Sequence, residues 1–254
     1  MTFSRYVALG DSFTEGVGDW DPSLPNGVRG WADRFAAGLA RAQGGDLEYA
    51  NLAIRGRKLR PIIAEQFEPA LAMRPDLVTL YAGANDIMRP KVDLEALFAT
   101  YDDAVARLTA SGATVVLFTA CDPGDTKVYA PVRGRFLRYC EAVRDTAARH
   151  GAMVIDYWQM AEYRDLRYWD DDRMHMSPAG HQHLAIAALD ALGVRHDLEE
   201  PVLADLPVMS RRERIAHDTR WAVAYLGPWI KRRITGRSSG DGLAPRRPSL
   251  QPVG

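Results

Sequence analysis

The sequence predicts an α/β protein in which helices cover both faces of a parallel β-sheet. Short apolar runs rich in strand-forming residues recur along the first two thirds of the chain, and longer segments with apolar residues at helical spacing separate them. The runs are apolar without alternation, which is typical of strands that are buried on both faces. Strands and helices that alternate in this way form a parallel sheet between two layers of helices.

Each predicted element has a local signal. The strands are short apolar runs at residues 6–9, 47–54, 77–82, 114–120 and 152–157. The helices have apolar residues three or four apart; one follows Gly30 and includes residues 31–39, and the others lie at residues 94–111, 132–150 and 177–192. The last of these has Pro178 in its first turn and Gly193 at its end, where each residue type is favoured.

Composition excludes several classes of protein. Of 254 residues, 47% are hydrophobic and 26% are charged, which indicates a globular domain and argues against a disordered chain or a membrane-spanning bundle. The two cysteines, Cys121 and Cys140, are too few for a disulfide framework and are not clustered as zinc ligands would be. The apolar run at residues 6–10 is too short for a signal peptide, so we expect a cytoplasmic protein.

Ligand sites in such sheets lie beyond the carboxyl ends of the strands, so the residues after each strand are the first candidates. The first strand is followed by Gly10 to Gly16, which places Ser12 at a tight turn between glycines. Taken alone, this serine would be read as a capping residue. A phosphate-binding loop fits less well, because Asp11 and Glu15 would repel the anion.

Two more candidate hydrogen-bond donors follow the second and third predicted strands. Gly56 ends the segment after the second strand, and Asn85 lies in the segment after the third. Each has an ordinary interpretation, a loop glycine and a turn residue. Together with the N–H of Ser12, however, the Gly56 N–H and the Asn85 amide could surround a developing oxyanion, which is a large source of stabilisation in acyl transfer.

Asp172 and His175 follow the fifth strand and are three residues apart. A carboxylate bonded to one ring nitrogen holds the imidazole in the tautomer whose other nitrogen can accept a proton from serine. The plain alternative is a solvated loop ahead of a helix. The remaining histidines fall in or at the ends of predicted helices, where we expect surface or packing roles.

These four blocks resemble those of the SGNH hydrolases, also called the GDSL esterase/lipase family. The resemblance covers about residues 6–192 and implies Ser12 as nucleophile, His175 as general base and Asp172 as its orienting acid. It also implies an oxyanion hole formed by Ser12, Gly56 and Asn85. The family fold is a three-layer α/β/α sandwich with a flavodoxin-like parallel sheet of about five strands. Phe13 stands where the family name would place leucine, and we expect it to affect packing.

The implied reaction is hydrolysis of a carboxylic ester or thioester through an acyl-enzyme on Ser12, with no metal and no organic cofactor. The substrate is a small-molecule or lipid-like ester. A carbohydrate O-acetylesterase is the alternative within hydrolases, and a non-catalytic binding module on the same fold is the alternative of another class. Substrate choice is expected to depend on the loops at residues 20–29 and 122–133.

The chain extends beyond this domain, which we place at residues 1–198. Residues 211–254 hold 10 basic and 3 acidic residues, whereas the rest of the chain is acidic. A capping box, Ser210 with Glu213, predicts a basic amphipathic helical extension within residues 199–236, kinked at Gly227-Pro228. The prolines, glycines and serines of residues 237–254 predict a disordered tail.

The helical extension has three interpretations. In the first, its apolar stripe, which includes Ile215, Leu226, Ile230 and Ile234, packs on the acidic domain. Its basic face and tryptophans also suit peripheral contact with an anionic membrane through residues 210–234. Binding of nucleic acid has only the charge in its favour and is the least favoured interpretation.

Overall fold

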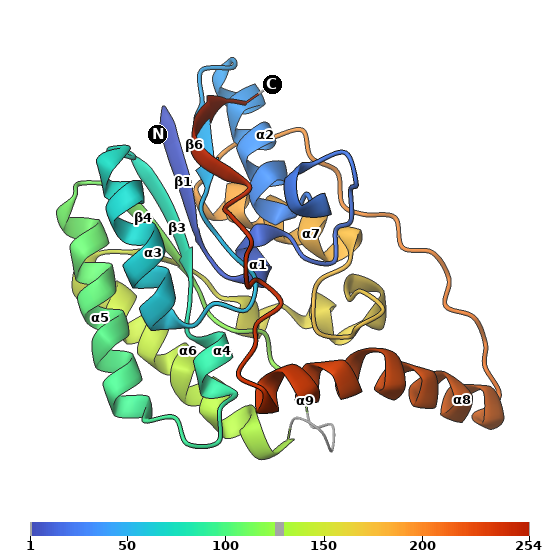
Figure 1. Cartoon of the computed structure of the whole chain (residues 1–254). Helices are drawn as coiled ribbons and strands as arrows, with labels where there is room; N and C mark the ends of the chain where they lie inside the picture. The colour runs from blue at the N-terminus through green and yellow to red at the C-terminus, as the bar shows by residue number, and fades with distance from the viewer. Residues whose placement is uncertain (1, 125–129, 254) are drawn as a thin grey trace.

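The computed structural model describes residues 2–124 and 130–253. Within them, six strands form one sheet between two layers of helices (Figure 1). The order across the sheet is β5-β4-β3-β1-β2-β6. The first five are parallel: β1 (Arg5–Gly10), β2 (Glu48–Asn51), β3 (Leu77–Tyr81), β4 (Thr114–Phe118) and β5 (Met153–Ile155). The predicted sandwich is therefore confirmed.

The two faces of the sheet pack into two separate hydrophobic cores, as the lack of apolar and polar alternation in the strands predicts. In β1, Val7 and Leu9 pack into one core, and Tyr6 and Ala8 pack into the other. All four are fully buried. Successive side chains of a strand point to opposite faces, so a strand covered on both sides must be apolar throughout.

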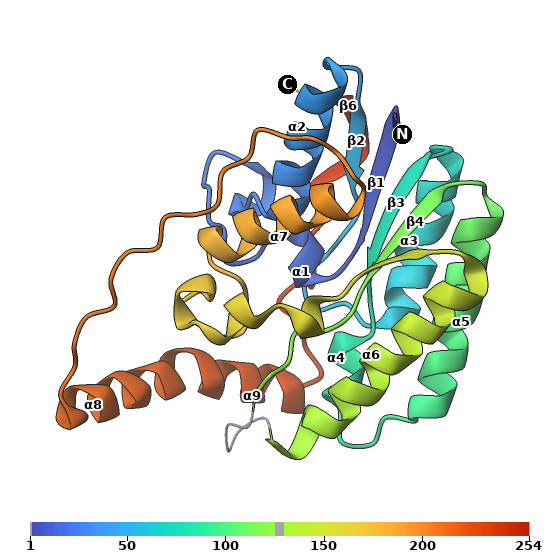
Figure 2. The ribbon, with the colours of Figure 1, turned by 180° about the vertical axis from the view of Figure 1, so that it is seen from behind.

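The helices divide between the two faces (Figures 1 and 2). The first core is covered by α3 (Leu59–Ala72), α5 (Leu94–Ala110) and α6 (Ala130–His150). The second is covered by α2 (Trp31–Gln43) and α7 (Pro178–Ala191). The adjacent strands β1 and β3 have connections that leave in opposite directions, from β1 to β2 and from β3 to β4. This opens a crevice at the carboxyl ends of β1 and β3, where ligands bind in doubly wound sheets.

The expected disorder of residues 237–254 is wrong. Arg247–Pro252 form β6, which pairs antiparallel with β2 and closes the edge of the sheet. The preceding Arg246 is buried and bonds the carboxylate of Asp33 on α2. Composition favoured disorder, but β2 offers unpaired backbone groups, and proline is tolerated in an edge strand.

The helical extension starts at the predicted capping box and bends differently from the prediction. Its parts are α8 (Arg211–Trp221), a π-helical turn (Ala222–Leu226) and α9 (Gly227–Ile234). Instead of breaking before Pro228, the helix continues through the π turn, where the Gly227 N–H bonds the Ala222 carbonyl five residues earlier. A π turn adds one residue, which accommodates the missing proline N–H.

This extra residue changes which side chains face the domain. Trp221, Leu226 and Trp229 are half-buried against it, whereas Ile215 and Ile234 of the expected stripe are exposed. Figures 1 and 2 show α9 beneath the carboxyl ends of the strands and α8 projecting away from the body. Across the described residues, no helix has the length and apolar character needed to span a membrane.

Candidate active site

Ser12 is the first residue of the short helix α1 (Ser12–Glu15), directly beyond β1. The Asp11 carboxylate caps this helix by accepting the Phe13 N–H at 3.1 Å. Buried Gln66 of α3 holds the strand end, because its amide donates to the Gly10 carbonyl and accepts the Gly10 N–H, both at 2.9 Å. The nucleophile candidate thus stands on a turn that is fixed from both sides.

The histidine and aspartate lie where the sequence analysis expects them. His175 Nε2 is 3.0 Å from Ser12 Oγ, and His175 Nδ1 is 2.6 Å from Asp172 Oδ2. The other carboxylate oxygen of Asp172 accepts the backbone N–H groups of Met174 and His175 at 2.8 and 2.9 Å. Because the ionised carboxylate takes the proton on Nδ1, Nε2 is left to accept the proton of the serine hydroxyl.

Burial opposes ionisation of Asp172, but the hydrogen bonds from His175 and Met174 outweigh it and lower the pKa of this carboxyl below its usual value. Asp172 is therefore a carboxylate at neutral pH. An ionised partner stabilises the imidazolium that forms when His175 accepts a proton.

Asn85 connects two of the predicted blocks. It lies on α4 (Ala84–Ile87), and its Nδ2 donates to Asp11 Oδ2 at 2.8 Å and to the Arg57 carbonyl at 3.1 Å. These bonds tie Asn85 to the neighbours of Ser12 and of Gly56. Among the described residues, neither the Ser12 nor the Gly56 N–H has a backbone acceptor outside helices and strands, so both remain candidate donors to an oxyanion.

The sequence analysis missed a buried ion pair that shapes this loop. Glu15 has a fully buried side chain, and its carboxylate accepts the Arg55 N–H at 2.6 Å and the Arg55 guanidinium at 2.8 Å. Glu15 thus fixes the residue that precedes Gly56. The only sequence signal is its place within the Ser12 segment, where its charge argues against a phosphate-binding loop.

The C-terminal extension also reaches this site; packing of its helix on the domain was one of the three interpretations, but no sequence signal indicated contact with the Asp172 loop. Trp221 Nε1 donates to the Asp172 carbonyl at 3.0 Å, and the guanidinium of Arg173 lies over the Trp221 ring at 4.9 Å. Arg173 also bonds Asp218 of α8 at 2.7 Å. Between this helix and the loop of Asp172 to His175 lies a cavity of about 170 Å³.

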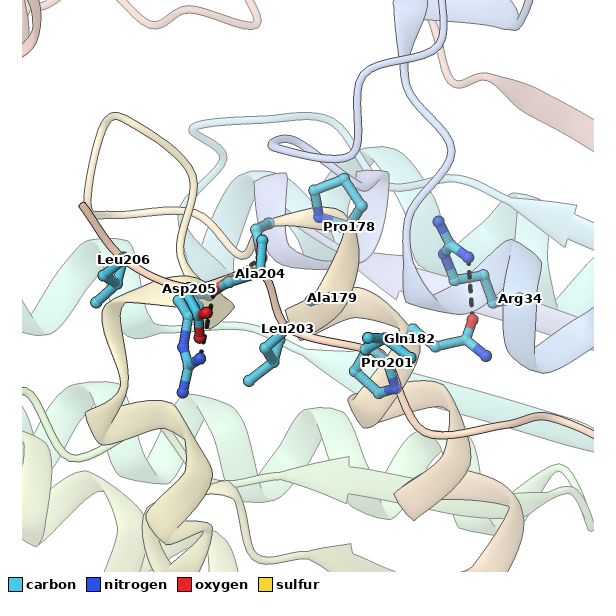
Figure 3. A pocket seen from close by; sticks show the side chains of 12 residues that line it. Arg34, Pro178, Ala179, Gln182, Pro201, Leu203, Ala204, Asp205 and Leu206 are labelled. Atoms are coloured by element: carbon cyan, nitrogen blue, oxygen red, sulfur yellow. Dashed lines mark hydrogen bonds between the residues drawn. The ribbon is translucent and has the colours of Figure 1, made fainter.

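A larger cavity of about 570 Å³ lies elsewhere, between the start of α7 and the segment 201–206 (Figure 3). Ser12, Asp172 and His175 are not part of its lining. Its two arginines are paired, Arg34 with Asp19 and Arg167 with Asp165. The larger cavity is therefore separate from the bonded series of Ser12, His175 and Asp172.

The other expectations near the site have mixed outcomes. Phe13 stacks on Tyr81 with ring centres 4.0 Å apart and contacts other buried aromatic rings, which agrees with the expected packing role. In the first candidate loop, Trp20 bonds Asp170 at 3.1 Å, close to the Asp172 segment. Residues 125–129 of the second loop lie outside the described residues.

A serine, a histidine and an aspartate bonded in series at the switch point of a doubly wound sheet define a serine hydrolase. The chain belongs to the GDSL-like lipase/acylhydrolase family, whose model matches residues 8–183. It is an ester hydrolase. The comparison with curated proteins gave no match.

Solved structures of several hydrolases share the fold. An acetylxylan esterase from Geobacillus stearothermophilus is 22% identical, with a TM-score of 0.62 over 76% of this chain and 96% of its own. An α/β hydrolase from the metagenome of Lake Arreo is 26% identical, with a TM-score of 0.62 over 75% and 95%. A lipase/acylhydrolase from Enterococcus faecalis is 18% identical, with a TM-score of 0.60 over 79% and 100%.

Proposed function

We propose that this ester hydrolase works through an acyl-enzyme on Ser12. The observation that carries the proposal is the bonded series Ser12, His175 and Asp172, with separations of 3.0 and 2.6 Å. Ser12 Oγ attacks the ester carbonyl while its proton passes to His175 Nε2. The imidazolium then protonates the leaving alcohol, and water releases the acid by the same route.

The oxyanion formed in each step is bound by the N–H groups of Ser12 and Gly56 and by the amide of Asn85. Both Asn85 amide hydrogens have acceptors in this structure, Asp11 Oδ2 and the Arg57 carbonyl. Asn85 therefore contributes to the oxyanion hole by exchanging or sharing one of these bonds when the negative charge develops.

Labelling with a fluorophosphonate, together with hydrolysis of p-nitrophenyl acetate, tests the role of Ser12. We expect wild type to be labelled and to hydrolyse the ester, and Ser12→Ala to lose both properties while keeping its melting temperature. Labelling that persists in Ser12→Ala, or folded wild type without any ester hydrolysis, would contradict the proposal. The second outcome would favour a binding module.

A carbohydrate O-acetylesterase is the second candidate. Trp221, Tyr225 and Trp229 line the cavity beside His175, and an indole face packs well against the apolar face of a sugar ring. The similar folds of acetylxylan esterases are in keeping with this candidate. Acetate release from acetylated xylo-oligosaccharides, faster than from butyl acetate at equal concentration, would support it.

We propose further that the outer surface of α8 and α9 contacts an anionic membrane. Ile215, Ile230 and Ile234 are exposed on these helices, and Val223 is exposed on the π turn between them. Exposed basic side chains, among them Arg211, Arg212, Arg214, Arg220 and Lys231, surround them. Apolar side chains that enter the interface and cations that attract acidic lipids act together in such helices.

Sedimentation with vesicles tests the contact. We expect full-length protein to bind phosphatidylcholine vesicles that contain phosphatidylserine at low salt, with weaker binding at high salt. Ile230→Ser with Ile234→Ser should weaken binding, and Leu166→Ser, at another exposed apolar site, should not. Absence of binding to anionic vesicles, or stronger retention by nucleic acid, would overturn this proposal.

A cytoplasmic location completes the proposal. Its support is that Cys121 and Cys140 are both free, as is usual for proteins of a reducing compartment. Fractionation of the source cells, with detection of the chain in the cytosol or on the inner membrane surface, tests it. Recovery from the culture medium would contradict it.

A further inference from the structure

The cavity between the loop of Asp172 to His175 and the C-terminal helices has two unlike walls. Asp172, Met174 and His175 form one wall. The other wall comes from the π turn and α9, with Trp221, Tyr225, Leu226, Pro228 and Trp229 among its residues. Two segments far apart in the sequence therefore build one pocket beside the histidine that exchanges protons with Ser12.

The lining indicates which part of an ester this pocket faces. It includes His175 and Asp172 but none of Ser12, Gly56 and Asn85. In acyl transfer the leaving alcohol must lie beside the imidazole that protonates it, whereas the carbonyl oxygen points toward the oxyanion donors. The cavity is therefore on the alcohol side of the reacting carbon.

The chemistry of the lining is mostly apolar. The indole N–H of Trp221 already donates to the Asp172 carbonyl, and the Arg173 guanidinium lies over the ring, so this side chain offers a ligand only the apolar ring surface that Arg173 leaves uncovered. Leu226, Pro228 and Met174 add aliphatic surface, and Arg232 is exposed to solvent at the rim. Such a lining favours an apolar group over one with several hydroxyls, because each buried hydroxyl needs a hydrogen-bond partner.

The volume limits the group further. A cavity of about 170 Å³ holds roughly five or six non-hydrogen atoms, at ~30 Å³ each, the share of one water molecule in the liquid. A butyl chain or a single ring meets this limit. A long acyl chain does not.

Resting on the proposed acyl-enzyme route, we propose that this cavity is a leaving-group pocket that selects esters of short apolar or aromatic alcohols. Its helical wall lies at residues 221–232, beyond the residues 8–183 that the family model matches. The C-terminal extension thus supplies substrate specificity to a reaction centre that the family domain supplies.

The test keeps the acyl group constant and varies the alcohol. We expect kcat/KM of wild type to be at least ~10-fold higher for butyl and benzyl acetate than for methyl acetate, as is typical of a pocket that buries apolar groups. In Trp229→Ala this preference should fall to about threefold or less, and Trp229→Phe should retain most of it. Leu137→Ala, at an exposed apolar residue of α6, is the matched control and should keep the wild-type preference.

A second series keeps ethanol as the alcohol and lengthens the acyl group from acetate to hexanoate. We expect Trp229→Ala to leave the ratios in this series unchanged. A change in acyl preference, with the alcohol preference retained, would overturn the proposal by placing the acyl chain in the pocket. Faster hydrolysis of acetylated sugars than of benzyl acetate would also overturn it.

Acyl transfer provides a readout that a merely structural role of Trp229 would not change. A pocket that holds the leaving alcohol also holds an acceptor alcohol in the reverse step, so added benzyl alcohol should capture the acyl-enzyme as benzyl ester in competition with water. The captured fraction should fall at least ~5-fold in Trp229→Ala. An unchanged fraction of acyl groups captured as benzyl ester in Trp229→Ala would overturn the assignment of the pocket. Absence of fluorophosphonate labelling in folded wild type would instead overturn the proposed function itself.

Discussion

Asn85 shows how much a single side chain connects in this site. Its amide bonds Asp11, which precedes Ser12, and the Arg57 carbonyl, which follows Gly56. Burial raises the pKa of Asp11 to about 7, against the hydrogen bonds from Phe13 and Asn85 and the nearby His175, which lower it. The group that Asn85 bonds therefore titrates near neutral pH, as groups at functional sites often do.

Replacing Asn85 by alanine should reduce kcat about 10²- to 10³-fold, because one oxyanion donor is lost. Steady-state hydrolysis of p-nitrophenyl acetate measures the effect. Fluorophosphonate labelling of Ser12 should remain detectable in the variant. A kcat within about threefold of wild type would remove Asn85 from the oxyanion hole.

His181 of α7 has a structural role that depends on its charge state. It is fully buried, its Nδ1 accepts the Trp31 N–H at 3.0 Å, and its Nε2 bonds the Val17 carbonyl at 3.1 Å. Burial lowers the pKa of His181 to about 4, although the nearby Asp19 acts in the opposite direction. The neutral ring therefore belongs to the folded state.

This lowered pKa predicts a loss of stability in acid. The unfolded chain protonates His181 near pH 6.5 and the folded chain near pH 4, so its contribution is present above pH 6.5 and is lost as the pH falls through that window. We expect the free energy of unfolding to fall on the order of 2 kcal/mol between pH 7 and pH 4.5 from this group. Urea denaturation of wild type and His181→Gln measures it, and equal slopes against pH in both would refute it.

At the scale of elements, β6 is held by more than backbone pairing. The guanidinium of Arg246 is fully buried and donates to the carbonyls of Val28 and Arg29 at 2.6 and 2.8 Å, besides its bond to Asp33. Asp33 is the third residue of α2. The strand is thus anchored to the helix that covers the same end of the sheet.

Arg246→Ala should destabilise the protein by about 3–5 kcal/mol, because it leaves the buried Asp33 carboxylate without its main partner. A double-mutant cycle with Asp33→Ala measures the interaction free energy between Arg246 and Asp33 separately from their other contacts. We expect the double variant to lose clearly less than the sum of the two single variants. Additive losses in denaturant unfolding would show that the pair contributes no coupling.

At the scale of the whole molecule, the C-terminal segment packs against elements from the first quarter of the chain. Ser238 and Gly240 pack against the loop of Arg55 and Gly56, where a Cβ on Gly56 would lie 2.2 Å from Ser238 Oγ and a Cβ on Gly240 would lie 2.2 Å from the Arg55 carbonyl. Gly56 also has a positive φ of 76°, which glycine adopts without strain. The C-terminal segment therefore supports the proposed oxyanion loop.

Truncation after Gly236 should lower the melting temperature by about 10 °C or more, since it removes β6 and the partner of Asp33. It should also reduce kcat/KM in protein that is still folded, because the Gly56 loop loses its support. Calorimetry and ester hydrolysis at low temperature measure the two effects. Ser249→Ala, at an exposed position of β6, is the control. An unchanged melting temperature in the truncated chain would contradict the stabilising role of the C-terminal segment.

Much of the fold and of the candidate site could be predicted because local patterns encode it. Unbroken apolar runs predicted the five parallel strands. The turn residues after three of those strands and the Asp172 loop predicted the polar groups that the structure brings together. The path of the final residues could not be predicted this way. Residues 237–254 have the composition of a disordered tail, yet Gln251 pairs with Tyr49, some 200 positions earlier.

The sequence by itself determined the α/β sandwich and its family, and it predicted which serine, histidine and aspartate lie in hydrogen-bonding distance, because periodicity and short motifs need only neighbouring residues. Tertiary structure decided that β6 closes the sheet edge and that Trp221 bonds the Asp172 carbonyl. Both are contacts between distant segments. Their free energy comes from burying apolar surface and pairing backbone groups that exist only once the sheet has formed, so no local pattern carries them.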